Sequence, residues 1–174
     1  MIDDRTVSAN NELTSTQKGV IAEHIVANGL MKESNGRLSP FSPLADEGID
    51  LLVYDKRTGK ALPIQIKSRT GGIVRYGRET NTIHFEIRSI ASKKSQGAFF
   101  LAVLMSKDLR SIERAWFVPM KAIPNLFNTR QKQAKYIMRP NKNSYSRDKF
   151  RKYQCLDIAE ITKKILDMFG KINV

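Results

Sequence analysis

The stretch Ala98–Met105 (AFFLAVLM) is an uninterrupted apolar run with the length of a β-strand. A strand without polar alternation is buried on both faces, as at the centre of a sheet that is covered on both sides. Residues 113–118 (ERAWFV) follow after a short turn and are predicted to form the neighbouring strand. We therefore expect a mixed α/β domain in which helices pack on a central sheet.

The other expected elements are placed by turn residues and by the change between helical and strand periodicity. A first helix is expected over Ser15–Asn28, capped by Thr14 or Ser15 and ended by Gly29. The remaining elements are a short strand near Leu38, strands over Ile49–Tyr54, Ala61–Ser68 and residues 82–87, short helices over Arg88–Gln96 and Met120–Phe127, and a final helix over Ile158–Phe169.

Local signals refine this outline. Pro63 indicates a sheet edge or a bulge near the start of its strand. Asp157 and Glu160 form a start that resembles a capping box, and Gly170 is expected to follow the end of the last helix. With no repeat and no second core, residues 1–174 are expected to form a single domain, preceded by a polar arm at residues 1–13.

The charge is concentrated in one part of the chain. The formal net charge is +13, yet residues 1–70 carry 9 acidic and 9 basic side chains, whereas residues 71–174 carry 8 and 21. A one-sided excess favours a polyanionic partner, because each neutralised phosphate releases counterions. A membrane surface is the weaker reading, since the basic stretches lack a clean amphipathic helix pattern. DNA is the expected partner, with RNA second and no membrane.

Two basic groups are expected to contact nucleic acid. One follows the second motif strand, and the other is the segment 129–153, where Tyr136, Tyr145 and Phe150 are interleaved with cations. For Tyr136 and Phe150, anchoring in the core is an equally good reading. The predicted nucleic-acid-binding residues are Arg75, Arg78, Lys93, Lys94, Arg130, Lys132, Lys135, Arg139, Lys142, Arg147, Lys149, Arg151 and Lys152.

The chemistry is expected from four polar residues on three elements. Gln65 and Lys67 are two apart on one strand and therefore project from the same face. A short hairpin brings Asp50 alongside them, and Glu23 lies near the packed side of the first helix. A glutamate there needs a partner or a cation. Mg²⁺ prefers oxygen ligands, and Lys67 is suited to positioning water and neutralising charge that grows on a phosphate.

A helix glutamate, a strand aspartate and then (D/E)-x-K on the next strand is a pattern that resembles the PD-(D/E)XK nuclease superfamily. The matching stretches read GVIAEHIVANG, DEGIDLLVYD and PIQIKS, within about residues 15–105. The resemblance implies a restriction-endonuclease-like core, a central mixed β-sheet flanked by helices. It also implies Mg²⁺-dependent hydrolysis of DNA, with Mn²⁺ as a substitute.

The implied catalytic residues are Glu23, Asp50, Gln65 and Lys67, and the implied metal ligands are Glu23, Asp50, Gln65 and Ile66. Gln65 departs from the pattern because it stands where the superfamily usually has an acid. It retains a carbonyl oxygen for a cation but removes one negative charge. The resemblance implies that some active members carry this exchange and that others have lost activity.

Three hypotheses follow. The first is a metal-dependent DNA endonuclease, the second an inactive protein of the same fold that binds DNA or RNA, and the third a basic protein of another fold. A homodimer is compatible with the first, since cutting both strands of a duplex usually needs two active sites. Cys155 is the sole cysteine, which suits a reducing cytoplasm, and the acidic start is unlike a signal peptide. A prokaryotic or phage-like source is expected.

Overall fold

The computed structural model describes residues 12–44, 48–88, 97–130 and 134–171. Its centre is a six-stranded mixed sheet with the order β1-β2-β3-β7-β8-β11. The strands are β1 (Leu38–Phe41), β2 (Leu51–Asp55), β3 (Lys60–Arg69), β7 (Phe99–Met105), β8 (Ile112–Pro119) and β11 (Gln154–Cys155). Only β3 and β7 pair in parallel, whereas the other neighbours are antiparallel.

The apolar run forms the central strand, as predicted. β7 lies between β3 and β8, and all but its first residue are buried. Leu101 and Val103 face one hydrophobic cluster, and Phe100 and Ala102 face the other. The six-stranded sheet thus has a core on each side, which is why this strand carries no polar alternation.

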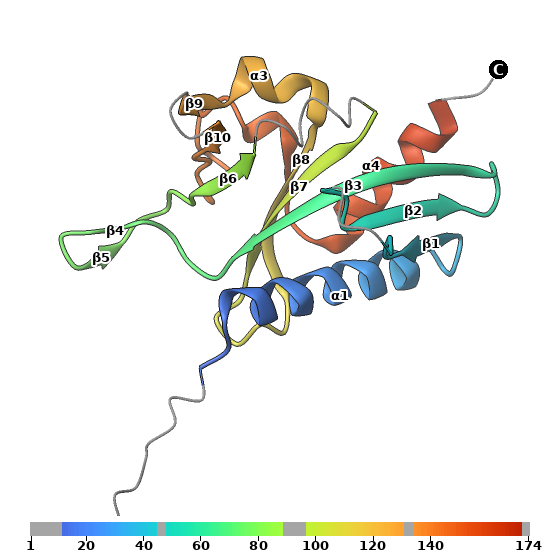
Figure 1. Ribbon diagram of the computed structural model, residues 1–174, viewed down its shortest axis with the longest axis horizontal. Coiled ribbons are helices and arrows are strands. Elements are labelled where there is room, and N and C mark those ends of the chain that lie inside the picture. Colours follow the sequence, from blue (N-terminus) through green and yellow to red (C-terminus); the bar gives the residue numbers. More distant parts are fainter. Residues whose placement is uncertain (1–11, 45–47, 89–96, 131–133, 172–174) are drawn as a thin grey trace, which may run out of the picture.

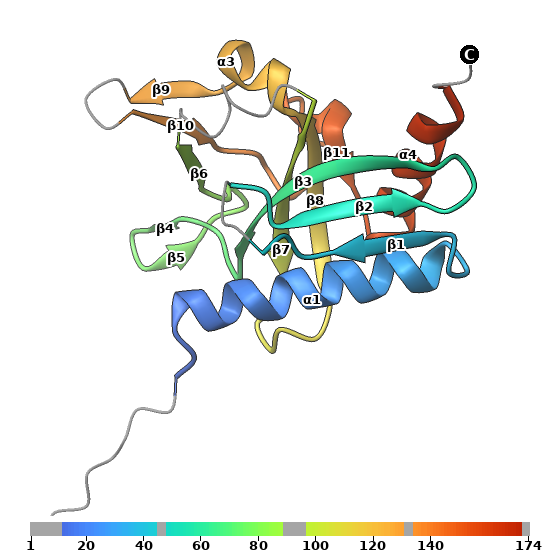
Figure 2. The same ribbon diagram turned by 45° about the vertical axis from the view of Figure 1, so that its right-hand side comes forward.

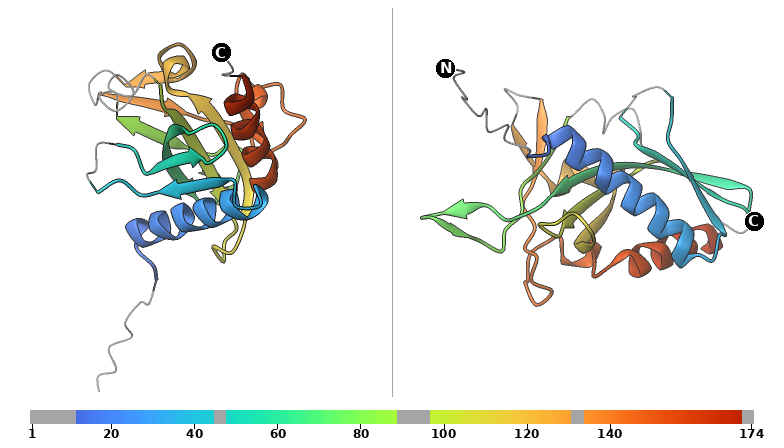
Figure 3. Two further views of the ribbon diagram at one scale, coloured as in Figure 1. Left: turned by 90° about the vertical axis from the view of Figure 1, so that its right-hand side faces the viewer. Right: turned by 90° about the horizontal axis from the view of Figure 1, so that it is seen from below.

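One face of the sheet is covered by two helices, α1 (Ser15–Glu33) and α4 (Ile158–Lys171) (Figure 1). Ala22, Val26 and Leu30 of α1 share a cluster with Ile161 and Ile165 of α4. The rotated views in Figure 3 also show both helices on the same side of the sheet.

The opposite face is covered by a second, three-stranded sheet with the order β6-β10-β9 and by a short helix (Figure 2). Residues Phe85, Tyr136 and Met138 of this layer pack against Trp116 and Phe100 of the main sheet. The elements are β6 (Phe85–Arg88), β9 (Asn128–Arg130), β10 (Lys135–Met138), a 3₁₀ turn η1 (Met120–Ala122), the helix α3 (Ile123–Leu126) and a second 3₁₀ turn η3 (Arg151–Tyr153).

Several boundaries differ from the sequence-based expectation. The basic segment 129–153 contains most of β9, all of β10 and η3, although no regular element was predicted there. Its strands form because β10 buries Tyr136, Ile137 and Met138, an apolar triplet enclosed by charged residues. Gly170 lies inside α4 rather than after it. The expected helix over Arg88–Gln96 and most of the arm over residues 1–13 fall outside the described residues, and Arg88 itself ends β6.

Pro63 lies at a local edge, as expected. The pairing of β3 with β7 begins at Ile64, one residue after Pro63, so the missing N–H of proline removes no hydrogen bond from that pair. Further along, β3 becomes an interior strand between β2 and β7.

The first helix continues past Gly29 to Glu33. Its start is as predicted, since Thr14 and Gln17 form a reciprocal capping box. Gly29 allows α4 to pack closely against α1, because a Cβ at this position would lie 2.4 Å from Cγ1 of Ile158 in α4. The glycine marks a close approach between two helices rather than a helix end.

Gly29→Ala is expected to lower the free energy of unfolding by about 1–3 kcal/mol, because the added methyl group must displace Ile158. Gly19→Ala is the matched control in the same helix, since a Cβ there meets nothing within 4 Å. It should instead raise stability by up to about 1 kcal/mol through helix propensity. Urea unfolding of both variants measures the difference, and equal gains would contradict the packing role of Gly29.

Candidate functional site

The predicted site lies where β2 and β3 separate. The first pair of these strands is Leu51 with Ile64, and Asp50 precedes it, with its N–H donating to the carbonyl of Ile64 at 3.0 Å. Beyond Ile64, β3 continues to Arg69 with β7 as its strand neighbour. On its side away from β7, β3 is therefore not paired with β2 beyond Ile64. We call this unpaired stretch of the β2–β3 ladder the gap, and Asp50 lies at its start, or mouth.

Asp50 closes part of this gap with its side chain. Its Oδ2 accepts a hydrogen bond from the backbone N–H of Ile66 at 2.5 Å. In an extended strand the N–H and C=O of one residue point the same way. The carbonyl oxygen of Ile66 therefore faces the same gap as the Asp50 carboxylate, and the two oxygen groups are brought together by strand geometry.

Gln65 presents a buried oxygen with no partner. Its neighbours Ile64 and Ile66 pack in the cluster with α1, so the Gln65 side chain lies on the other face of β3, where it is only 6% exposed. Its Oε1 accepts no hydrogen bond from any described residue. Leaving a buried acceptor unsatisfied costs about 1–3 kcal/mol. A buried carbonyl oxygen without a partner is suited to a cation that prefers oxygen ligands.

Lys67 is the second residue that β3 contributes to this face of the predicted site. It lies two residues after Gln65 on β3, on the same face, and its side chain is exposed. Asp50, Gln65, Ile66 and Lys67 are thus gathered over a few residues of two strands. The Lys67 ammonium stays accessible to an anion that approaches this face.

Glu23 comes from the other layer. It lies in α1 between the buried residues Ala22 and Val26, is half-buried, and belongs to a helix that contacts β3 and β1. Its place in the site remains a prediction. Within the described ranges, no three His, Cys, Asp or Glu side chains gather closely enough to hold a metal ion. Asp46 and Glu47, the loop acids ahead of Asp50, lie outside those ranges.

An electrostatic network that sequence reasoning missed lies on the outer face of β6 and β10. Glu86 accepts a hydrogen bond from Lys135 Nζ at 2.8 Å and contacts Nε2 of His84 at 3.0 Å. Lys135 first, and then His84, lower the pKa of Glu86 to about 2. Arg139 Nε donates to Nδ1 of the same imidazole at 3.3 Å. The alternation of residues 82–87 could have placed His84 and Glu86 together, but the partner strand was not predicted.

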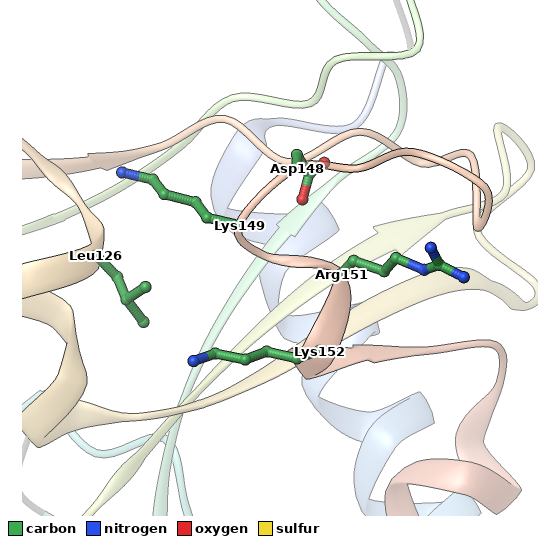
Figure 4. A pocket seen from close by; sticks show the side chains of 5 residues that line it. All are labelled: Leu126, Asp148, Lys149, Arg151 and Lys152. Atoms are coloured by element: carbon green, nitrogen blue, oxygen red, sulfur yellow. The ribbon is translucent and has the colours of Figure 1, made fainter.

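A second group of cations surrounds a shallow hollow of about 590 Å³ near α3 (Figure 4). Lys149, Arg151 and Lys152 line it together with Leu126 and Asp148. The Asp148 carboxylate accepts hydrogen bonds from the N–H groups of Phe150 and Asn141 at 2.8 and 2.7 Å, which hold the loop in shape.

The aromatic residues of the basic segment divide between core and surface. Tyr136 and Phe150 are 9% and 4% exposed and pack in the core, so they are not available to stack on bases. Tyr145 is 84% exposed and remains available. Lys93, Lys94 and Lys132 lie outside the described residues, as does the side chain of Arg130.

Comparison with known proteins supports the fold. The structure is similar to that of a bacterial homing endonuclease, I-Ssp6803I, with a TM-score of 0.55 and 17% sequence identity, over 92% of this chain and 98% of the other. A likeness at this identity shows the fold alone, and the predicted restriction-endonuclease-like architecture of a mixed sheet flanked by helices is confirmed. No family model matches the sequence, and no match is found among curated proteins.

The helices of the described segments carry no membrane signal. None of them is both long and apolar enough to cross a bilayer.

Proposed function

We propose that this protein is a metal-dependent DNA endonuclease that hydrolyses phosphodiester bonds at the mouth of the gap between β2 and β3. The observation that carries the proposal is the buried, unsatisfied Oε1 of Gln65, which shares a face of β3 with Lys67 and precedes Ile66, whose N–H binds the Asp50 carboxylate. The fold, which is similar to that of a homing endonuclease, supports the same reading.

The residues of the gap fit Mg²⁺. Asp50, Gln65 and the backbone carbonyl of Ile66 would hold the cation, with Glu23 as a further carboxylate from α1. Mn²⁺ fits the same oxygen ligands. A cation bound there would supply Lewis-acid polarisation of a phosphoryl oxygen.

The side chains of the protein perform the remaining tasks. The Asp50 carboxylate supplies negative charge at the mouth of the gap, and its bond from Ile66 N–H fixes its orientation. Lys67 is exposed on the same face and neutralises negative charge that grows on the phosphate during attack. The lysine also orients the attacking water by donating a hydrogen bond to it.

The substrate class follows from charge. The 21 basic residues of positions 71–174 outnumber the 8 acidic ones, and their exposed members include Arg75 and Arg78 shortly after β3 and Lys149, Arg151 and Lys152 around the hollow near α3. Phosphate contacts of this kind position a nucleic acid without reading its sequence. The proposed localisation is the cytoplasm, and a homodimer would supply a second site for the opposite strand.

Incubation of the purified chain with supercoiled plasmid, linear duplex and single-stranded DNA tests the proposal. Cleavage is expected with Mg²⁺ or Mn²⁺ and none with EDTA. If no DNA is cut with either metal, and calorimetry detects no divalent cation in the DNA complex, the enzyme proposal fails.

A second function has an observation in its favour. Gln65 is neutral where a third acid would strengthen the cation site, and no cluster of three metal-binding side chains is present in the described ranges. An inactive protein of the same fold that holds DNA through its basic surface is therefore the alternative, and binding without cleavage identifies it.

Gln65→Glu is expected to tighten divalent cation binding about tenfold or more, because a carboxylate replaces a neutral oxygen beside Asp50. Isothermal titration with Mg²⁺ and Mn²⁺, on wild type and variant, measures the change. Gln154→Glu is the control, since that amide is half-buried but donates to the carbonyls of Asn141 and Lys142 in a different part of the fold. Unchanged cation affinity in the Gln65 variant would show that Gln65 Oε1 is not a ligand.

A further inference from the structure

A small hairpin projects from the body of the protein immediately after β3. Its strands are β4 (Val74–Arg75) and β5 (Arg78–Glu79), and they pair with each other alone. Figures 1 and 3 show it extending away from both sheets. Val74 follows Lys67 by seven positions, so the hairpin is attached to the end of the strand that carries Gln65 and Lys67.

The tip of the hairpin is exposed and cationic. Tyr76 and Val74 are 103% and 66% exposed. Arg75 and Arg78 are directly opposite each other in the register, and both are exposed. No carboxylate among the described residues forms an ion pair with either guanidinium. Like charges facing each other across two strands are destabilising, so the arrangement has no structural benefit in the free protein.

The turn has an unusual residue at its first position. Tyr76 and Gly77 have φ values of 50° and 73°, the left-handed pair that a two-residue hairpin turn requires. Glycine, asparagine and aspartate tolerate this conformation, whereas a bulky residue rarely adopts it. The strain is not offset by packing, because the ring is fully exposed. An aromatic residue is therefore presented at the tip of the hairpin, in the turn that joins Arg75 to Arg78.

The base of the hairpin is fixed to the body. Glu79 Oε1 accepts a hydrogen bond from the N–H of Gly72 at 2.9 Å and lies 3.5 Å from Lys142 Nζ. Its other oxygen lies 3.7 Å from Lys107 Nζ. These contacts, the Gly72 N–H first, lower the pKa of Glu79. A fixed base with an unpartnered tip is the geometry of an element that is positioned for a ligand.

We propose that the β4–β5 hairpin enters the major groove of duplex DNA beside the site, an inference that rests on the proposed function. A two-stranded ribbon fits the major groove, which is about 12 Å wide. Arg75 and Arg78 supply the donors that reach guanine edges or the flanking phosphates, and Tyr76 contacts bases or thymine methyl groups at the tip. Because β3 leads directly into the hairpin, the groove that it reads lies next to the phosphate that approaches Lys67.

A second copy of the chain is the competing occupant, since Val74 and Tyr76 are apolar. In a symmetric contact the same patch meets itself, which would bring four unpaired guanidinium groups together. The charge therefore favours a polyanion over another copy.

Photocrosslinking tests the occupant directly. The full chain with benzoylphenylalanine in place of Tyr76 is irradiated in EDTA with a short labelled duplex of mixed sequence. A protein–DNA adduct is expected at this position and not at Leu156, an exposed control beside α4. A crosslinked protein dimer, or the absence of a DNA adduct, overturns the inference.

The double variant R75Q/R78Q tests the proposed contact of the two arginines with the major groove of DNA. It is expected to weaken binding of the duplex about tenfold or more and to flatten the log–log salt slope by roughly 1.8. Protection of guanine N7 from methylation by the wild type should also be lost. K163Q/K171Q removes the same charge from exposed positions of α4 and should change binding far less. If both pairs weaken binding equally, the hairpin makes no specific contact.

These measurements test DNA binding by the hairpin separately from DNA cleavage at the proposed site. All binding is measured in EDTA, so an inactive protein still reports on the groove. A chain that cleaves DNA but shows no hairpin crosslink would overturn this inference and leave the proposed nuclease intact. A hairpin crosslink without cleavage would support the contact with DNA and count against the proposed nuclease activity.

Discussion

Asp50→Asn is expected to lower the rate of DNA cleavage by about 10³-fold or more, with DNA affinity in EDTA nearly unchanged. The substitution keeps an oxygen that can accept the Ile66 N–H, so the geometry at the mouth of the gap is preserved. What it removes is the only negative charge among Asp50, Gln65 and Lys67, because Gln65 is neutral and Lys67 is a cation. Single-turnover cleavage at saturating protein measures the loss.

Lys67→Ala should show a similar loss of rate for a different reason. Its ammonium acts on charge that develops during attack, so the variant should bind DNA and cation and still fail to cleave. Divalent cation titration separates the two variants, since Asp50→Asn should also weaken the cation whereas Lys67→Ala should not.

The controls match each substitution. Asp108→Asn changes an exposed carboxylate of the turn between β7 and β8 that also accepts a backbone N–H, that of Arg110. Lys56→Ala removes an exposed lysine of the turn between β2 and β3. Both should cleave normally. If the Asp50 variant retains activity within about tenfold of these controls, the site is placed wrongly.

Asp55→Asn is expected to lower the free energy of unfolding by about 2–4 kcal/mol at neutral pH. Asp55 is fully buried and receives two hydrogen bonds from Arg37, at 2.7 and 2.8 Å, as well as one from the Thr58 hydroxyl and one from the Arg57 N–H. The substitution removes the charge that Arg37 compensates. Because Asp55 is the last residue of β2, the loss should loosen the hairpin that carries Asp50.

The pH dependence has a defined sign. Arg37 first, with help from Thr58 and Arg57, holds the pKa of the Asp55 carboxyl well below its usual range. The stabilisation is therefore complete above the unfolded value of about 3.9 and is lost as the pH falls towards the lower folded value. Urea unfolding between neutral and acidic pH should show that the difference in free energy of unfolding between wild type and variant shrinks on the acidic side. A difference in the free energy of unfolding that does not change with pH would contradict an ionic origin of the stabilisation.

Much of the architecture could be predicted from the amino-acid sequence because the signals are local. The apolar run at Ala98–Met105 predicted the central strand, since six consecutive residues of β7 can be buried only between two layers. Thr14 and Gln17 lie three residues apart, which is the spacing of the observed capping box. The two-residue period of a strand placed Gln65 and Lys67 on one face without any tertiary information.

Other features depend on residues that are distant in the sequence. Gly29 reads as a helix end locally, but α1 continues to Glu33, and Gly29 instead leaves room for Ile158 of α4. Tyr136 and Phe150 could be read from the sequence either as base-stacking residues or as core anchors, and the structure packs both in the cluster with Trp116 and Phe100 of the main sheet. The contact of Gly29 with Ile158 joins the first and last helices, and the ring of Phe150 packs on that of Phe127, the residue after α3.

The sequence alone determined the two long helices, the first five strands of the main sheet, the charge asymmetry and the face shared by Gln65 and Lys67. The tertiary structure decided that Asp50 reaches the Ile66 N–H, that Gln65 Oε1 is buried without a partner, and that the Arg75–Arg78 tip stands clear of the body. The physical reason is that periodicity and caps are set by neighbours along the chain. Burial, hydrogen-bond satisfaction and the gap between β2 and β3 arise only when distant segments pack together.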